Sequence, residues 1–223
     1  MTATVTKVGA DPVGAARGGS VAHAAFEIRG LVLRRELLPG EQLRQEDLAQ
    51  RIGISRGPIR EALQVLAVEG VVRYERNRGY FIARFTTDEM QQLYTIRDLL
   101  ESAMLERLPI PAESVLAELR EINEQIRTGG DDLATVIELN SRFHDLMLQQ
   151  SGMRILHEQL HHISRMTTAY QALSINAFTD WKLLASDHDQ LIAALEAGDN
   201  DALCAAAREH RNRSLERLGP LLG

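Results

Sequence analysis

The feature that most constrains the fold lies between residues 43 and 80, where two short helical patterns are separated by a tight turn. The first pattern stops at Gly53, which can adopt the left-handed conformation that often ends helices. Ser55 can then cap a second helix. Arg56 and Arg60 share one face of that helix because they are four residues apart, and apolar residues form a stripe behind them. The apolar residues of the two helices are Leu48, Ala49, Ile52, Ile59, Leu63, Leu66 and Ala67. A second helix of this kind suits the major groove of DNA.

A β-hairpin is predicted directly after the second helix. Residues 71–75 and 80–84 are expected to form its two strands. The connection consists of Arg76, Asn77, Arg78 and Gly79. Its asparagine and glycine suit positive φ, and its arginines would lie over a phosphate backbone or in the minor groove. Two helices, a turn and a basic hairpin together predict a module that reads DNA.

These segments resemble the winged helix-turn-helix of the GntR family of bacterial transcription regulators. The resemblance is carried by P-G-E-Q-L at 39–43, by G-I-S-R-G-P-I-R-E-A-L at 53–63, and by E-G-V-V and N-R-G-Y-F-I within 69–82. The chain departs from many relatives at Gly57, where they carry threonine and could make a side-chain contact. The residues predicted to contact DNA are Arg34, Arg44, Ser55, Arg56, Gly57, Arg60, Arg76, Asn77, Arg78 and Gly79.

The net charge of −6 over 223 residues conceals an asymmetry along the chain. Residues 21–84 hold eleven arginines against eight acidic residues, a net charge of +3. Residues 85–223 hold twelve Lys and Arg against twenty-two acidic residues, a net charge of −10. The first part attracts phosphate and the second repels it, which would orient the molecule on DNA.

The composition predicts a folded protein of a reducing compartment. An apolar content of 44% is enough for a genuine core. The single Cys204 excludes an intramolecular disulfide, and no apolar run approaches the length that spans a bilayer. We therefore expect a cytoplasmic protein without a membrane partner.

The chain is predicted to be mainly α-helical and to have two domains. Residues 1–20 are interpreted as a disordered arm, and 21–84 as the winged helix-turn-helix domain, which opens with a helix at 22–37. Residues 85–88 would form a linker in which Thr87 or Asp88 caps the next helix. The remainder, 89–223, is predicted to be an all-α bundle of about six helices, at 88–108, 112–127, 131–150, 153–173, 179–197 and 199–218. This part resembles the FCD-type effector-binding domain of the FadR-like branch of the family.

Four residues of the helical part are candidate metal ligands. Asn140 and His144 share one helix face, a geometry that lets two side chains chelate one ion. His188 and His210 lie on two later helices. A lone histidine on a helix is more often a surface or core residue. In metal-binding members of the branch, however, an Asp or Asn and a His from one helix converge with two later His residues on a divalent ion, and these four residues match that pattern.

The resemblance thus implies a divalent metal ion, Zn²⁺ first, with Ni²⁺ or another transition metal as alternatives. An amide and three neutral imidazoles leave the charge of the ion uncompensated. Metal affinity should fall as a result, and attraction for an anionic effector should rise. His157, His161 and His162 form a competing cluster. Because no downstream residue pairs with them in the sequence pattern, we expect their side chains to be mostly exposed.

Arg97 allows two interpretations. It lies four residues before Glu101, so an exposed ion pair along one helix is the simpler one. In the relatives that this domain resembles, the matching arginine faces the ligand pocket, where a guanidinium suits a carboxylate. Arg97 is therefore the candidate effector-binding residue.

The leading functional hypothesis is a homodimeric transcription regulator that binds a short inverted repeat of double-stranded DNA and responds to a small carboxylate effector. A regulator that senses the metal itself is one alternative. A metal-dependent hydrolase is another, because three histidines with open coordination positions can activate water. The candidate general bases near the histidines are Asp145, Asp187 and Asp189, which can instead orient imidazoles or cap a helix. The chain is therefore predicted not to be an enzyme.

Overall fold

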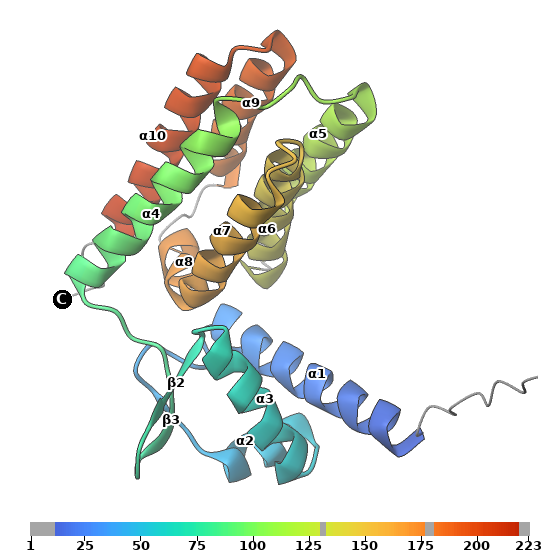
Figure 1. The fold of residues 1–223 in the computed structure, drawn as a ribbon, viewed down its shortest axis with the longest axis vertical. Coiled ribbons are helices and arrows are strands. Elements are labelled where there is room, and N and C mark those ends of the chain that lie inside the picture. The colour runs from blue at the N-terminus through green and yellow to red at the C-terminus, as the bar shows by residue number, and fades with distance from the viewer. Residues whose placement is uncertain (1–11, 130–132, 177–180, 219–223) are drawn as a thin grey trace, which may run out of the picture.

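The structure is a computed structural model that describes residues 12–129, 133–176 and 181–218. Figure 1 shows a small winged-helix part and, above it, a bundle of helices. The described residues form ten helices and three short strands, which confirms the predicted fold class. None of the described helices is long and apolar enough to cross a lipid bilayer.

The winged-helix part contains a three-stranded antiparallel sheet in the order β1-β3-β2. Its elements are α1 Pro12–Leu33, β1 Gln42–Leu43, α2 Gln45–Ile52, α3 Arg56–Val68, β2 Val72–Glu75 and β3 Gly79–Ile82. The two-residue strand β1 escaped prediction because it is too short to show alternation. Ile28 of α1 packs with Ile59, Leu63 and Leu66 of α3 in a core from which solvent is excluded. This core sets the angle at which α3 is presented.

The turns of the winged helix have the predicted conformations. Gly53 ends α2 with φ 77°, and its N–H donates to the carbonyl of Ala49. Asn77 and Gly79 in the wing have φ values of 63° and 92°, as their positions required. Ser55 does occupy the N-cap of α3, but its hydroxyl makes no capping hydrogen bond. The side chain of Ser55 therefore does not cap α3 as the sequence predicted.

The first helix is longer than predicted at its start and shorter at its end. It begins at Pro12, inside the segment interpreted as a disordered arm, while residues 1–11 of that arm lie outside the described residues. Proline suits a first helical position, but the glycines that follow hide any apolar period. The helix ends at Leu33 rather than at residue 37, because Arg35 adopts a φ of 60° that an α-helix cannot contain.

The second part contains seven described helices instead of about six. They are α4 Thr87–Leu105, α5 Glu113–Thr128, α6 Leu133–Gln149, α7 Arg154–Met166, α8 Thr168–Asn176, α9 Trp181–Ala197 and α10 Asn200–Leu218. The starts predicted at 131 and 179 lie outside the described residues, as do residues 219–223. The helix predicted at 153–173 is interrupted at Thr167, whose hydroxyl donates to the carbonyls of Ile163 and Ser164. Such back-bonding by threonine bends helices.

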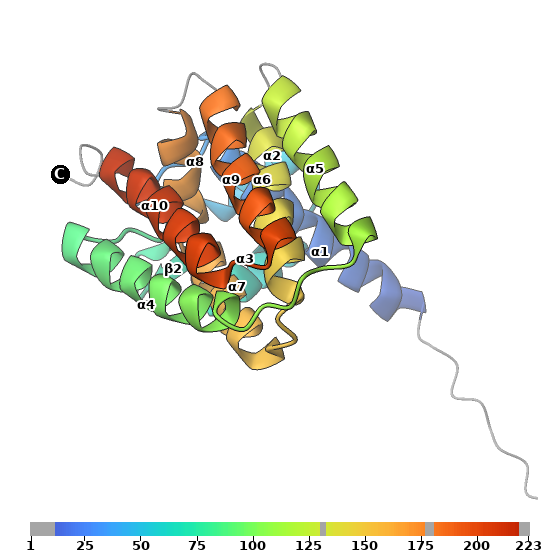
Figure 2. The same cartoon turned by 90° about the horizontal axis from the view of Figure 1, so that it is seen from above.

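Viewed from above, α4, α10, α9 and α5 lie side by side, with α6, α7 and α8 packed beneath them (Figure 2). The N-cap of α4 is Thr86 and not Thr87 or Asp88. Its side chain accepts from the backbone of Glu89, and the Glu89 carboxylate accepts from the backbone of Thr86, which completes a capping box. The start of α4 is thereby fixed directly after the wing.

Helix α8 joins the two parts. The Tyr170 hydroxyl accepts from the Phe85 N–H at 2.8 Å and donates to the Phe85 carbonyl at 3.3 Å, just before α4. Ala169 is buried in the core of the winged helix. At the preceding end of α7, Met166 lies so close to Gly70 that a Cβ there would come within 2.6 Å of its Cγ. Gly70 lies two residues after the end of α3, so this junction contacts the chain just beyond the helix that is predicted to read DNA.

Candidate functional site

The three predicted histidine ligands converge from three different helices. The ring centroids of His144 on α6 and His188 on α9 are 5.1 Å apart. His210 on α10 lies 5.1 Å from His144 and 5.4 Å from His188. One nitrogen from each ring lies within 4.8 Å of the others. His188 and His210 are buried and His144 is half-buried, so the cluster belongs to the interior of the bundle.

A hydrogen bond sets the orientation of His188. Its Nδ1 lies 3.1 Å from Oδ1 of Asn123. The Asn123 amide nitrogen donates to the carbonyl of Ala185 at 2.9 Å and to Asp189 at 2.7 Å, so its oxygen accepts from His188. Nδ1 therefore carries the hydrogen and Nε2 keeps its lone pair. The ring is further held by Phe143, which stacks on it at 4.0 Å.

A carboxylate orients His210 in the same way. Nδ1 of His210 lies 3.2 Å from Oδ2 of Asp187, and Arg213 also pairs with that carboxylate at 2.7 Å. Burial works against the charge of Asp187, but hydrogen bonds from His210 and Arg213 hold the pKa of its carboxyl below the ordinary value. Partners of this kind raise the basicity of a ligating imidazole. The sequence-based interpretation of Asp187 as an orienting group agrees with this geometry.

The interior keeps two of the imidazoles neutral. Burial, followed by the neighbouring His210 and His188, holds the pKa of His144 well below 6.5. Burial and His210 lower the pKa of His188 in the same direction. Neutral imidazole is the form that binds metals, because the ligating nitrogen must not carry a proton.

Two buried polar atoms at this centre have no hydrogen-bond partner among the described residues. They are Nε2 of His188 and Oδ1 of Asn140, which lies one turn before His144 on α6. Leaving a buried acceptor unpaired costs about 1–3 kcal/mol, so native structures seldom do it without a compensating partner. Both atoms carry lone pairs that a cation would accept. The donor set therefore fits a divalent metal ion bound by three imidazoles and one amide oxygen.

A cavity of about 240 Å³ adjoins this centre and is lined by residues of α4, α6, α7, α8, α9 and α10. Asn140, His144, His210 and Arg97 are all among its lining residues. Arg97 pairs with Glu101 at 3.1 Å, yet its side chain is only 15% exposed. The pair predicted along the helix is thus present, but it lies in the cavity wall and not on an exposed surface.

Other cationic residues of the cavity were not anticipated. Arg211 is buried, pairs with Asp98 and with Glu101, which it shares with Arg97, and also lines the cavity. Arg165 lines it from the end of α7, and its buried Nε has no hydrogen-bond partner in the described part of the chain. The sequence shows both only as arginines on helices, because their convergence depends on how the helices pack.

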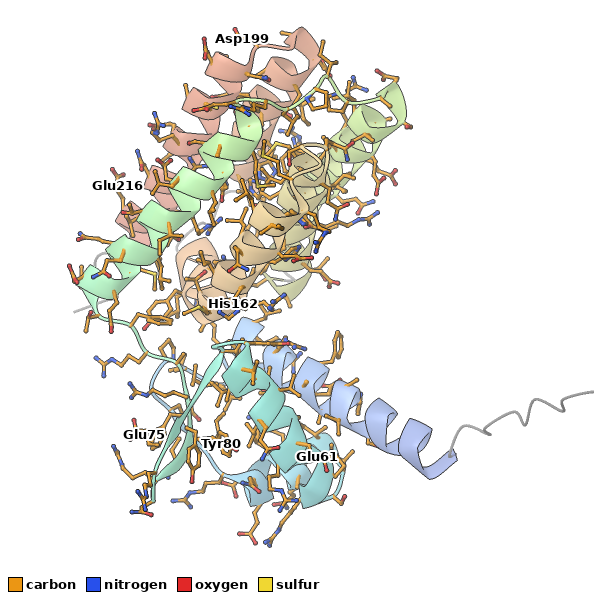
Figure 3. The ribbon with its side chains drawn as sticks, in the orientation of Figure 1. Glu61, Glu75, Tyr80, His162, Asp199 and Glu216 are labelled. Carbon is orange, nitrogen blue, oxygen red and sulfur yellow. The ribbon has the colours of Figure 1, made fainter. Side chains whose placement is uncertain are left out.

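The competing histidines are not mostly exposed, which corrects that expectation. All three are half-buried. His157 and His161 both contact Asp145, at 2.7 and 2.5 Å. This partner lies upstream of them, on α6, and not downstream. His162 lies at the end of the bundle that faces the winged helix (Figure 3).

The residues predicted to contact DNA lie on the surface of the winged helix. Along α3 and the wing, all of them are exposed except Gly79, which is half-buried, and Arg34 and Arg44 are exposed as well. Glu61 on α3 and Glu75 on the wing lie in the winged-helix part, below the bundle (Figure 3). Arg56 pairs with Glu46, Arg78 with Glu75 and Arg34 with Glu36, so phosphate contacts would replace these surface pairs. A Cβ at Gly57 would meet no atom within 4 Å, so packing does not require a glycine there.

Both parts of the chain match known families. The family model of the FCD domain matches residues 92–213, and that of bacterial regulatory proteins of the gntR family matches residues 21–82. The uncharacterised HTH-type transcriptional regulator YdhC of Bacillus subtilis is 24% identical over 201 residues, which cover 88% of this chain and 89% of that protein. The HTH-type transcriptional repressor RspR of Escherichia coli is 24% identical over 187 residues, which cover 80% and 82%. The gluconate operon transcriptional repressor of Bacillus subtilis is 24% identical over 185 residues, which cover 79% and 76%.

Solved structures show the same fold. E. coli McbR/YncC superposes with a TM-score of 0.74 at 19% identity and covers 92% of this chain and 99% of its own. A putative GntR regulator from Rhodococcus sp. RHA1 has a TM-score of 0.74 at 20% identity, with coverage of 90% and 98%. The families and named relatives are transcription regulators and not enzymes, in agreement with the prediction from the sequence.

Proposed function

The chain belongs to the GntR family of bacterial transcription regulators, with an FCD domain after its winged helix-turn-helix, and we propose that a small carboxylate bound beside a divalent metal controls its affinity for DNA. The observation that carries the proposal is that Asn140, His144 and His210 line the same cavity as Arg97. The metal and the effector would therefore share one cavity. Two relatives are named as transcriptional repressors, which supports repression as the mode of regulation.

Charge explains why the effector would be an anion. Amide and imidazole ligands carry no charge, so an ion bound by Asn140 and the three histidines would keep its full positive charge. Arg97 and Arg211 add two guanidinium groups, which share Glu101 between them. A carboxylate could complete the coordination of the metal and accept hydrogen bonds from Arg97. The cavity would thus be cationic within an otherwise acidic domain.

Two helices could carry the signal to the DNA-reading part. Arg97 lies on α4, which starts directly after the wing. Thr168 and Gln171 of α8 line the cavity, while Ala169 and Tyr170 of the same helix pack on the winged helix and on Phe85. A ligand that moves α8 would therefore shift the surface on which the winged helix rests. A difference in affinity of about 1.4 kcal/mol between two arrangements would change operator affinity tenfold.

We further propose that two copies of the chain bind a short inverted repeat, because a twofold dimer presents two α3 helices to successive major grooves. Sequencing genomic fragments that the purified protein retains would identify the operator. Footprinting on that operator should show two half-sites about 10 base pairs apart, or a multiple of that spacing. A single protected half-site would argue against a dimer.

Arg60→Ala should weaken operator binding by about 1–3 kcal/mol if Arg60 reads a base, and the loss should be greatest for the operator sequence. Arg78→Ala should weaken all sequences alike and reduce the slope of affinity against salt, because a phosphate contact carries no sequence information. Fluorescence anisotropy at several salt concentrations measures both effects. Arg154→Ala, which removes an exposed arginine of α7, is the control for net charge. Wild-type affinity in both DNA variants would place these residues outside the interface.

The effector hypothesis predicts that some carboxylate from a panel of sugar acids and hydroxy acids changes operator affinity in the metal-loaded wild type. The same acid should have little effect on His144→Ala, which lacks a ligand of the metal. Operator binding is measured with each acid, with Zn²⁺ alone and with both. An equal response in both proteins would place the effector elsewhere. A response to Zn²⁺ alone would favour a regulator that senses the metal itself.

A further inference from the structure

We propose that Asp145, His157 and His161 form a second site for a divalent transition metal, in the wall of the same cavity but separate from the three-histidine centre. The three residues offer one ligand atom each, and these atoms lie within 4.8 Å of one another. They come from α6 and α7, whereas the first centre is built by α6, α9 and α10. The inference goes beyond the proposed function and does not depend on the first ion.

The geometry brings two imidazole nitrogens to one carboxylate oxygen. Nε2 of His157 lies 2.7 Å and Nε2 of His161 lies 2.5 Å from Oδ1 of Asp145. The two histidines are one turn apart on α7, and their rings stand at 84° with centroids 4.7 Å apart. Two histidines at this spacing can chelate one ion. A carboxylate opposite them supplies the third ligand.

The carboxylate is held in place for this role. Gln149, one turn further along α6, donates to Oδ2 of Asp145 at 2.8 Å. Oδ1 is therefore the oxygen left to face α7. Although His144 is the preceding residue, successive side chains of an α-helix point about 100° apart. Asp145 can thus meet α7 while His144 faces α9 and α10.

Hydrogen bonds from both imidazoles to Asp145 are the competing explanation. They would place two donors on a single carboxylate oxygen. A Zn²⁺ ion needs ligand distances of about 2.0–2.2 Å, and tetrahedral ligands then stand roughly 3.3 Å apart. Each nitrogen would have to withdraw from the oxygen by less than about 1 Å, which small rotations of the side chains provide. The arrangement is therefore close to the geometry of a site with bound metal.

The site is accessible, and its charge is favourable. All three residues line the cavity, and the side chains of His157, Asp145 and His161 are 16%, 29% and 43% exposed. The negative charge of the Asp145 carboxylate compensates part of the charge of a divalent ion. The first centre has only neutral ligands and provides no such compensation. Nitrogen and oxygen donors of this kind suit Zn²⁺, Ni²⁺ or Co²⁺. Three protein ligands leave at least one coordination position open toward the cavity.

The test counts ions in metal-free full-length protein titrated with Zn²⁺ against a chromophoric chelator, with Co²⁺ absorption spectra as a second readout. Wild type should bind two ions per chain. The double variant His157→Gln with His161→Gln should bind one, because a glutamine amide can still donate to Asp145 but is a poor ligand. His188→Ala with His210→Ala should also bind one ion, with a different Co²⁺ spectrum. His162→Gln, a half-buried neighbour on α7, is the matched control and should still bind two.

The outcomes separate this inference from the first centre. If the wild type binds one ion, and His188→Ala with His210→Ala removes it, the second site is refuted and the first stands. If the one ion is lost only in the His157 and His161 variant, the second site stands and the first is refuted. Asp145→Asn keeps the shape of the side chain, so it should weaken the second ion alone. Should the histidine variant lose its helical circular dichroism, Asp145→Asn decides the question, and an unchanged affinity for the second ion would overturn the inference.

Discussion

Glu101→Ala is expected to destabilise the protein by about 3–5 kcal/mol, because it leaves buried positive charges without their partner. Glu101 is 6% exposed and pairs with both Arg97 and Arg211. Burial alone would lower the pKa of Arg97, and Glu101 is the main group that raises it again. Asp98 still pairs with Arg211 in the variant, but within the described part of the chain it forms no ion pair with Arg97. Arg97 would therefore bear most of the loss.

The loss is measured as the free energy of unfolding in urea, in metal-free protein, so that metal binding does not contribute. The chain offers a matched control in Glu158, which pairs with Arg154 at the same spacing and in the same order on α7. That pair is on the surface, with side chains 75% and 55% exposed, so Glu158→Ala should cost about 1 kcal/mol or less. Equal losses in the two variants would show that Glu101 does not compensate buried charge.

His188→Ala combined with His210→Ala should remove one equivalent of divalent metal from the purified protein. It should also remove the stabilisation that this ion provides, which mass action sets at about 4 kcal/mol when free metal exceeds its Kd a thousandfold. The ion would join α6, α9 and α10, so its loss should lower Tm. The decisive quantity is the change in Tm on adding Zn²⁺, because the substitutions themselves also disturb the core.

The amide ligand gives a finer test of the same centre. Asn140→Asp supplies a charged oxygen at the same place, so metal should be retained longer in competition with a chelator. Faster loss of metal would mean that Asn140 is not a ligand. Unchanged metal content in the double histidine variant would refute the whole centre. His162→Gln serves again as the control for loss of a histidine.

The helix-turn-helix and the wing were predictable because they depend on local patterns. Gly53, Asn77 and Gly79 occupy turns whose positive φ few other residues tolerate, and their spacing from the apolar stripes is visible in the sequence. The pairing of Asn140 with His144 on one helix face was equally local. Their convergence with His188 and His210 was expected from the resemblance to the family; the structure brings one ring nitrogen each of His144, His188 and His210 within 4.8 Å of one another.

Other parts of the site could not be predicted. Asn123 on α5 orients His188 across 65 positions of sequence, and Asp145 meets His157 and His161 from an earlier helix. The prediction of one continuous helix was wrong at Thr167. The hydroxyl of this residue donates to the backbone carbonyl of Ile163 and interrupts the helix, although the apolar period continues. The docking of α8 on the winged helix was also hidden, because Ala169 and Tyr170 look like ordinary apolar residues of a bundle.

The sequence by itself determined the class of the protein, the helix-turn-helix with its wing and the types of residue available to bind a metal, because helical period and turn chemistry act over a few residues. Only the tertiary structure decided which side chains share a cavity, which buried charges compensate each other and which helix contacts the winged helix. Those relations depend on packing between segments far apart in the chain. Packing is set by the total burial of apolar surface and satisfaction of polar groups, which no local pattern records.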